Sequence, residues 1–245
     1  MFTTLMPGFR DLRAALVAGG LLLGCVYILI GDRLPHASTL RTQLRAIAHL
    51  NSAMPTVLAV LGCVLVGSLY TTALEGLVDW LHRRLLHVDV AAIGSPLKRR
   101  LFTALVPFSV ASRSRLITEA GRLYDQTGPS SSSVTRTAFQ DQVLADVLWL
   151  EGKLVGTALK DPHDQYRSEG ELRLATGLLL PLCTATMLYG VRAHVLWLVL
   201  AVFVGAALGM WQVNYGLYYY RRANSFLAHH IADGTLKTPS MESLH

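Results

Sequence analysis

Four long runs of apolar residues dominate the pattern along the chain. They cover residues 14–31, 55–74, 174–191 and 195–220, and none contains Asp, Glu, Lys, Arg or His. About 20 apolar residues cross a hydrocarbon core, and in lipid the backbone must satisfy its own hydrogen bonds, so each run is expected to be a helix. The pattern predicts an all-α integral membrane protein with four transmembrane helices, the third and fourth forming a hairpin.

The second run continues into polar sequence without a helix breaker until Gly94, so we expect one helix from the membrane through Leu86. Ser95 followed by Pro96 is typical of an N-cap and a first helical residue, and it predicts a short helix over residues 97–106. Residues 75–173 as a whole are expected to form a helical layer between helices two and three.

Within this layer Ser112 is expected to cap a helix over residues 113–126, and the Ser-rich residues 128–133 are expected to form a loop. Residues 134–159 carry an apolar stripe with three- and four-residue spacing, which predicts an amphipathic helix. The stripe fits packing within the chain better than contact between subunits. Asp161, which precedes a proline, is expected to start a helix that runs on into the third membrane helix.

The distribution of Lys and Arg predicts the orientation. With both termini and residues 75–173 in the cytoplasm, eighteen of the 22 basic residues face inward, as the positive-inside rule requires. We therefore expect a multi-pass protein of the inner cell membrane, with N- and C-termini and the tail 221–245 cytoplasmic. Leu22 to Cys25 resembles a lipoprotein cleavage box, but the apolar run continues beyond it, so we expect no cleavage.

Composition agrees with this class, since 52% of residues are hydrophobic and only 16% are charged. The net charge of +6 follows from the membrane topology and does not indicate nucleic-acid binding, because no aromatic platform accompanies it. Basic residues concentrate within 83–122, where they can contact anionic lipid headgroups. The candidates for this contact are Arg83, Arg84, Lys98, Arg99 and Arg100.

Small residues recur at four-residue spacing in three of the membrane runs and predict close helix packing, within one chain or between subunits of a homo-oligomer. The candidates are Gly20, Gly24, Ala59, Cys63, Gly67, Ala201, Gly205 and Gly209. Pro181 interrupts the third run, where it would either kink the helix statically or act as a hinge.

Catalytic and cofactor motifs are absent from the sequence, and the three cysteines lack CxxC spacing, so we expect neither an enzyme nor a cofactor. Glu75, Asp79 and His82 share one face of helix two and form a weak candidate for a divalent cation or a proton relay. Ordinary ion pairing at the membrane edge, such as Asp79 with Arg83, is the favoured alternative.

Three functions remain open at this point. The first is a self-associating, membrane-anchored scaffold or sensor, with residues 129–133 and 134–159 meeting a cytoplasmic protein partner. The second is a homo-oligomeric pore or regulated ion channel lined by helix two, with Glu75 and Asp79 at the inner mouth and Ser68, Thr71 and Thr72 above them. Bestrophins share this order of two helices, polar layer and two helices, which is an analogy of layout only. The third is an enzyme acting on lipid headgroups.

Overall fold

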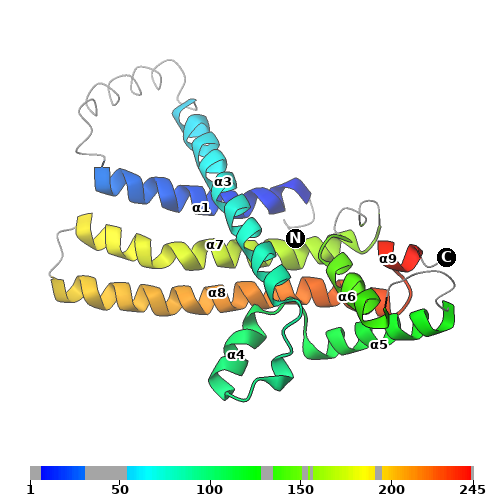
Figure 1. Cartoon of the computed structure of the whole chain (residues 1–245). Coiled ribbons are helices and arrows are strands. Elements are labelled where there is room, and N and C mark those ends of the chain that lie inside the picture. The colour runs from blue at the N-terminus through cyan, green and yellow to red at the C-terminus, as the bar shows by residue number, and fades with distance from the viewer. Residues whose placement is uncertain are drawn as a thin grey trace. The chain divides into compact units, whose positions relative to one another are not determined.

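The structure is a computed structural model that describes residues 7–30, 54–127, 135–150, 154, 157–190 and 195–243. These residues form helices and turns, with no strand among them (Figure 1). The predicted all-α class is therefore confirmed. The elements are α1 (Pro7–Ile30), α3 (Met54–Leu85), η2 (Val90–Ala92), α4 (Pro96–Leu105), α5 (Val110–Thr127), α6 (Arg136–Val147), α7 (Lys160–Gly190), α8 (Val195–Ala232) and α9 (Pro239–Glu242).

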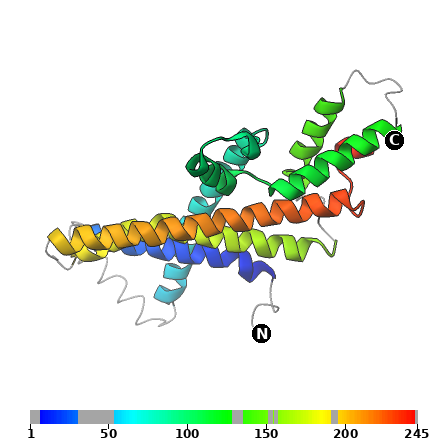
Figure 2. The same ribbon diagram turned by 90° about the horizontal axis from the view of Figure 1, so that it is seen from below.

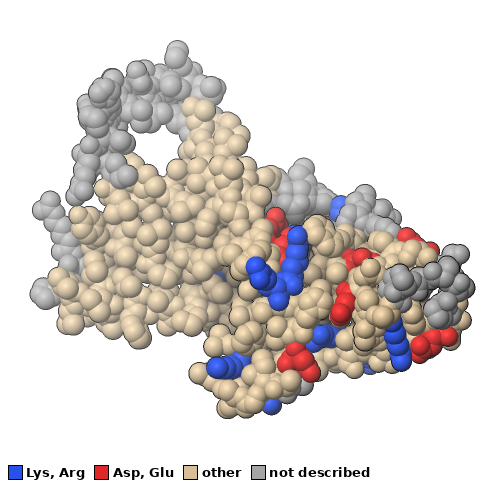
Figure 3. All heavy atoms as spheres, viewed as in Figure 1, with Lys and Arg blue, Asp and Glu red and all other residues tan. Residues whose placement is uncertain are grey.

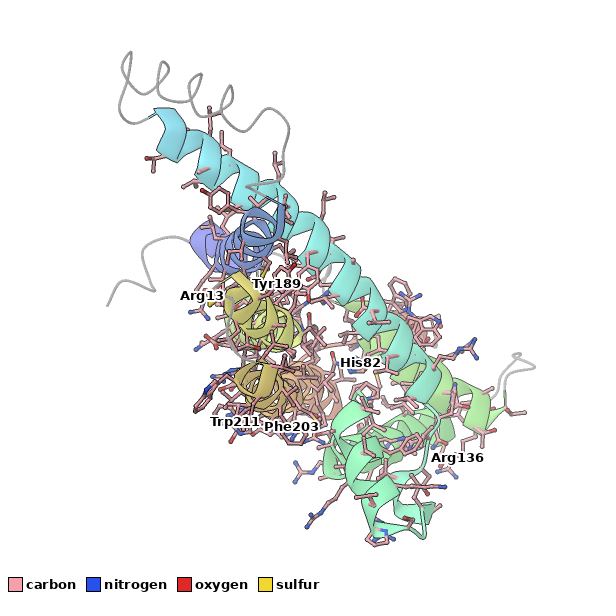
Figure 4. The ribbon with its side chains drawn as sticks, turned by 90° about the vertical axis from the view of Figure 1, so that its left-hand side faces the viewer. Arg13, His82, Arg136, Tyr189, Phe203 and Trp211 are labelled. Carbon is pink, nitrogen blue, oxygen red and sulfur yellow. The ribbon has the colours of Figure 1, made fainter. Side chains whose placement is uncertain are left out.

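Four of these helices, α1, α3, α7 and α8, are long and apolar enough to cross a membrane. Large hydrophobic side chains are exposed on the surface of these helices, where a water-soluble protein would have polar ones. Phe203 and Trp211, for instance, both stand exposed on α8 (Figure 4). By length and composition the chain is a multi-pass membrane protein, as the pattern of apolar runs predicted.

The chain divides into two compact units. The first, which we call the membrane unit, comprises Met1–Glu75 and Glu171–Gly216, and the second, the polar unit, comprises Gly76–Gly170 and Leu217–His245. On the face in Figure 3, Lys, Arg, Asp and Glu gather over the polar unit. The helices α3, α7 and α8 each contribute residues to both units without a break. The predicted continuations of helix two and of the third membrane helix are thus confirmed.

Helix α8 continues well past Tyr220, where the sequence pattern predicted the end of the fourth helix and the start of a tail. No Pro or Gly interrupts residues 221–232, and Leu227 and Ile231, one turn apart, are both buried in the polar unit. The helix stops where Gly234 takes a φ of 74°, a left-handed conformation that suits glycine. Beyond it, Met241 of α9 is also buried.

The core of the polar unit brings together α5, α6, α9 and the end of α8 (Figure 2). Its largest buried side chains include Leu116, Leu144 and Leu227. The apolar stripe predicted to pack within the chain does so, since Phe139, Val143, Val147, Leu150 and Leu154 all belong to this core.

Two local predictions in this unit need correction. Helix α6 ends at Val147 and not near residue 159. Leu150 and Leu154 are nevertheless buried, so the apolar stripe is buried beyond the end of this helix. The α5 helix starts at Val110, and Ser109 rather than Ser112 accepts the capping hydrogen bond, since the Ser112 N–H donates to Ser109 Oγ at 3.1 Å. The Ser-rich residues 128–133 lie outside the described residues.

In the membrane unit, α1 and α3 touch backbone to backbone at glycines. A Cβ added to Gly19 would overlap the carbonyl of Cys63, and one added to Gly67 would overlap the carbonyl of Ala15. Only glycine permits so close an approach, and such contacts associate helices in lipid. Gly67 and the Cys63 backbone both lie in this contact within one chain.

The α7 and α8 helices approach each other in the same way and lie side by side in both views (Figures 1 and 2). A Cβ on Gly209 would overlap the carbonyl of Gly177, and one on Gly205 would overlap the hydroxyl of Thr184. Both Gly205 and Gly209 therefore pack within the chain, as part of a contact that also needs Gly177 on the facing helix.

The remaining small-residue candidates lie elsewhere. Gly20 and Gly24 are exposed, and a Cβ on Gly24 would meet nothing within 4 Å. Ala59 is exposed and Ala201 is half-buried. On α1 the glycine that contacts α3 is thus Gly19, one residue before the predicted Gly20. The way in which α1 and α3 cross determines which side of α1 faces α3.

Candidate functional site

The short helix α4 presents an unusual surface, because none of its residues is buried. Leu97 and Leu101, one turn apart, are 72% and 58% exposed. Lys98, Arg99 and Arg100 between them are exposed as well. Exposed leucines next to three cations make a small amphipathic, basic surface of the kind that binds at membrane interfaces.

Hydrogen bonds hold α4 in place within the polar unit. The Arg99 guanidinium donates from Nε and Nη2 to the Ile93 carbonyl, at 3.1 and 2.9 Å, which ties the helix to the segment before it. The Arg221 guanidinium of α8 donates to the Thr103 carbonyl near the other end of α4. The leucines therefore project from a helix that is anchored at both ends.

The acidic residues that the structure describes in the polar unit form no ion pair with α4. Asp125 pairs with Arg136 at 3.0 Å, and Glu119 pairs with Arg122, whose guanidinium holds the pKa of the Glu119 carboxyl below its usual value. Over the described residues, Lys98 and Arg100 have no ion-pair partner. Two positive charges on α4 are thus available to an external anion.

The other headgroup candidates, Arg83 and Arg84, stack on aromatic rings. The Arg83 guanidinium lies 4.0 Å from the centre of the Trp149 ring, and that of Arg84 lies 5.5 Å from the Trp80 ring. Both tryptophans are more than half exposed. Such Arg–Trp pairs have an apolar face and a charged edge, a combination found where proteins meet lipid headgroups.

A pocket of about 320 Å³ lies in the polar unit, between the last turn of α3, the turn that joins α4 to α5, and the first half of α5. Its lining is mainly aliphatic and aromatic, with Leu85, Val106 and Phe108 among its members. Arg113 is its one basic lining residue, and its guanidinium donates from Nη1 to the Val88 carbonyl at 2.9 Å. No sequence pattern predicts this pocket, and the turn at Pro107 and Phe108 is the local feature that comes nearest to indicating it.

The predicted set of Glu75, Asp79 and His82 lies on one face of α3. Glu75 and Asp79 are half-buried and each has an interaction of its own, while His82 is 2% exposed. Within the described residues no three potential metal ligands form a group, so the metal candidate gains no support. His82 projects from α3 (Figure 4). Its ring and that of Tyr220 form a T-shaped pair with their centres 6.3 Å apart. Its Nε2 atom is buried without a hydrogen-bond partner among the described residues.

One of the three candidate pore hydroxyls on α3 is engaged within the helix itself. Thr71 donates its hydroxyl to the Ser68 carbonyl at 3.2 Å, and Thr72 is exposed. Around them the exposed side chains are leucines, with Leu65 and Leu69 at 68% and 75% exposure. The surface of α3 in the membrane unit is therefore mostly apolar in one chain, which suits lipid as well as another subunit.

Pro181 lies inside a continuous helix α7. Thr184 donates its hydroxyl to the Leu180 and Pro181 carbonyls, at 3.0 Å each, and so takes part in the altered hydrogen bonding near the proline. This geometry suits a static bend as well as a hinge, and the hinge stays a prediction.

Cys25 of α1 and Cys183 of α7 lie together, with their sulfur atoms 3.3 Å apart. Both are buried and both are free thiols. The Thr186 hydroxyl also donates to the Cys25 sulfur at 3.3 Å. Because the two cysteines are 158 residues apart, no local spacing in the sequence could have paired them.

Comparison with protein-family models, with curated proteins and with solved structures finds no match for this chain.

Proposed function

We propose that this protein is a non-enzymatic, membrane-anchored sensor that reads the anionic lipid surface beside it. In this proposal the four apolar helices anchor the chain, the polar unit lies in the cytoplasm, and α4 contacts the inner leaflet. The surface of α4 carries the proposal, since Leu97 and Leu101 are exposed beside the unpaired Lys98 and Arg100.

The expected free energies support a contact that responds to lipid composition. A basic residue near an anionic surface contributes about 1 kcal/mol, and full burial of a leucine contributes about 1.5–3 kcal/mol. The leucines favour any bilayer, while Lys98 and Arg100 favour an anionic one. Anionic lipid would therefore shift α4 between water and the headgroup region, which is the response expected of a sensor.

The continuity of three helices supplies a route for the response. Helix α8 carries Arg221, which holds α4 by its Thr103 carbonyl, and the same helix continues without a break into the membrane unit. A change in how α4 is held would thus act on an element that is shared by both units. Self-association and a cytoplasmic protein partner remain predictions that this proposal accommodates but does not need.

The test places a nitroxide label on α4 of the full chain in lipid nanodiscs. Leu101→Cys carries the label in a background where the native cysteines are replaced by alanine, and Gln142→Cys, exposed on α6, is the matched control. Relaxation by a water-soluble and a lipid-soluble reagent reports the depth of each label. With anionic lipid, the label at position 101 should move into the headgroup region, and the label at 142 should stay in water.

Charge is then removed while Leu97 and the label at position 101 are kept. Lys98→Gln combined with Arg100→Gln should abolish the dependence on anionic lipid while leaving the control label unchanged. If the label at position 101 remains in water with every lipid composition, the proposal is wrong. A label that stays at the same depth with neutral and anionic lipid would leave α4 as an anchor and refute its role as a sensor.

A further inference from the structure

We infer that the pocket beside α4 binds one single-chain lipid with an anionic head, a fatty acid, whose carboxylate is held by Arg113. The inference deepens the proposed function and rests on it in one respect, namely that the ligand comes from the leaflet that α4 contacts.

The walls of the pocket fit an alkyl chain. They include Leu86, Val90, Val106, Phe108, Val110 and Ile117, from four successive segments of the polar unit. The volume of about 320 Å³ lies at the lower end of the range for small-molecule sites, which suits one chain rather than two. Val110 is exposed while Val106 and Phe108 are buried, so the lining passes from the surface to the interior.

Arg113 supplies the polar group that would fix a head. Among the described residues, only Nη1 of its guanidinium has a hydrogen-bond acceptor, the Val88 carbonyl. The Nε atom is buried and has no partner among the described residues. No carboxylate within the described part of the chain forms an ion pair with Arg113.

An unpaired N–H of a charged group next to apolar walls is costly, and a carboxylate relieves it best. One guanidinium can donate two parallel hydrogen bonds to one carboxylate, which suits a carboxylic acid better than a neutral head. Ser114 and Thr118, one turn apart on α5, also line the pocket and offer hydroxyl donors. Asp89 lines it too, and its negative charge weakens the binding of an anion there.

The position of the pocket agrees with supply from the membrane. Val106 to Phe108 follow α4 directly along the chain, so the segment that bears the exposed Leu97 and Leu101 leads into the pocket wall. The alkyl chain of a fatty acid that leaves the bilayer beside α4 would meet apolar side chains along this segment.

The experiment uses the full chain in nanodiscs of zwitterionic lipid and a fatty acid that carries a photoreactive diazirine on its chain. After irradiation, peptide mass spectrometry locates the labelled residues. The result expected for the wild type is labelling at the pocket wall, at Val106 to Phe108 and around Ile117. Unlabelled fatty acid should compete, whereas the fatty alcohol of equal length and inorganic phosphate should not. A lysophospholipid with a phosphate head serves as the fourth competitor and should compete less well than the fatty acid.

Two variants separate the head from the chain. Arg113→Gln should reduce labelling about tenfold, the loss expected for a charge-assisted hydrogen bond, while Arg115→Gln, exposed on the same helix, should leave it unchanged. Ser114→Phe adds a bulky side chain to the pocket lining while Arg113 is kept, and it should also abolish labelling, which tests the site of the alkyl chain if Arg113→Gln fails to fold.

Each other outcome contradicts the inference in a definite way. Equal competition by the alcohol would show that the pocket binds chains without reading the head. Competition by inorganic phosphate alone would indicate that the site binds a free anion. Stronger competition by the lysophospholipid than by the fatty acid would indicate that the ligand has a phosphate head and not a carboxylate. Absence of label from the pocket, together with a normal response of the α4 label, would overturn this inference and leave the proposed function standing.

Discussion

Two adjacent glycines of α1 should respond oppositely to one added methyl group. A Cβ on Gly19 would overlap the carbonyl of Cys63 on α3 and lie 2.9 Å from the Cys63 Cα. A Cβ on Gly20 would meet only the Cys63 sulfur, at 4.0 Å, and Gly20 is exposed. The substitutions Gly19→Ala and Gly20→Ala are therefore chemically identical, one residue apart, and differ only in what they meet.

The magnitudes follow from that difference. Overpacking a tight contact costs about 1–3 kcal/mol, and the obstacle at Gly19 is backbone, so α1 and α3 must separate along the contact. Alanine in place of glycine stabilises a helix by about 1 kcal/mol, which applies at both positions. The free energy of unfolding should thus fall by up to about 2 kcal/mol in Gly19→Ala and stay equal or rise by up to about 1 kcal/mol in Gly20→Ala.

The assay is reversible unfolding of the purified chain in mixed micelles, followed by tryptophan fluorescence as the denaturing detergent is increased. Gly67→Ala, whose Cβ would overlap the Ala15 carbonyl, should behave like Gly19→Ala, and Gly24→Ala, with nothing within 4 Å, should behave like Gly20→Ala. Equal effects of Gly19→Ala and Gly20→Ala would refute a crossing of α1 and α3 at Gly19. A larger loss in Gly20→Ala would restore the packing face predicted from the sequence.

Two further predictions concern buried polar atoms. His82→Phe keeps an aromatic ring against Tyr220 and removes the unpartnered Nε2, so the free energy of unfolding should rise by about 1 kcal/mol or more. The control His87→Phe, at an exposed position, should change the free energy of unfolding little. A loss of stability in His82→Phe alone would show that Nε2 has a partner. Diamide, which accepts the two thiol hydrogens as the S–S bond forms, should link Cys25 to Cys183 in the wild type and in Cys63→Ala, detected by mass spectrometry of the linked peptides. Recovery of both thiols unlinked after treatment would mean that α1 and α7 do not pack against each other at these cysteines.

The membrane helices were predictable because their signal is local and one-dimensional. A run of about 20 apolar residues specifies a helix in lipid whatever its neighbours are, and all four runs are helices in the structure. The continuation of α3 through His82 was equally predictable, since it required only the absence of a breaker. The ends of helices were less predictable. Ser109 and Ser112 are both suitable N-caps, and only the burial of Pro107 and Phe108 decides that Ser109 caps α5.

The candidate site was only half visible in the sequence. Lys98, Arg99 and Arg100 stand out as a cluster, and so they were named, but nothing local shows that Leu97 and Leu101 remain uncovered. Pocket residues from the end of α3 to the middle of α5 come together only when α4 and its turn fold back, so Arg113 looked like any surface arginine.

By itself the sequence determined that this chain crosses a membrane in four helices and carries a helical, charged layer between the second and third. Composition and run length act on each segment separately, so no partner segment needs to be known. Only the tertiary structure decided that Gly19 rather than Gly20 meets α3, that Cys25 lies against Cys183, and that Arg113 borders a pocket. These facts depend on the angles at which helices cross, which are set by close packing between residues far apart in the chain.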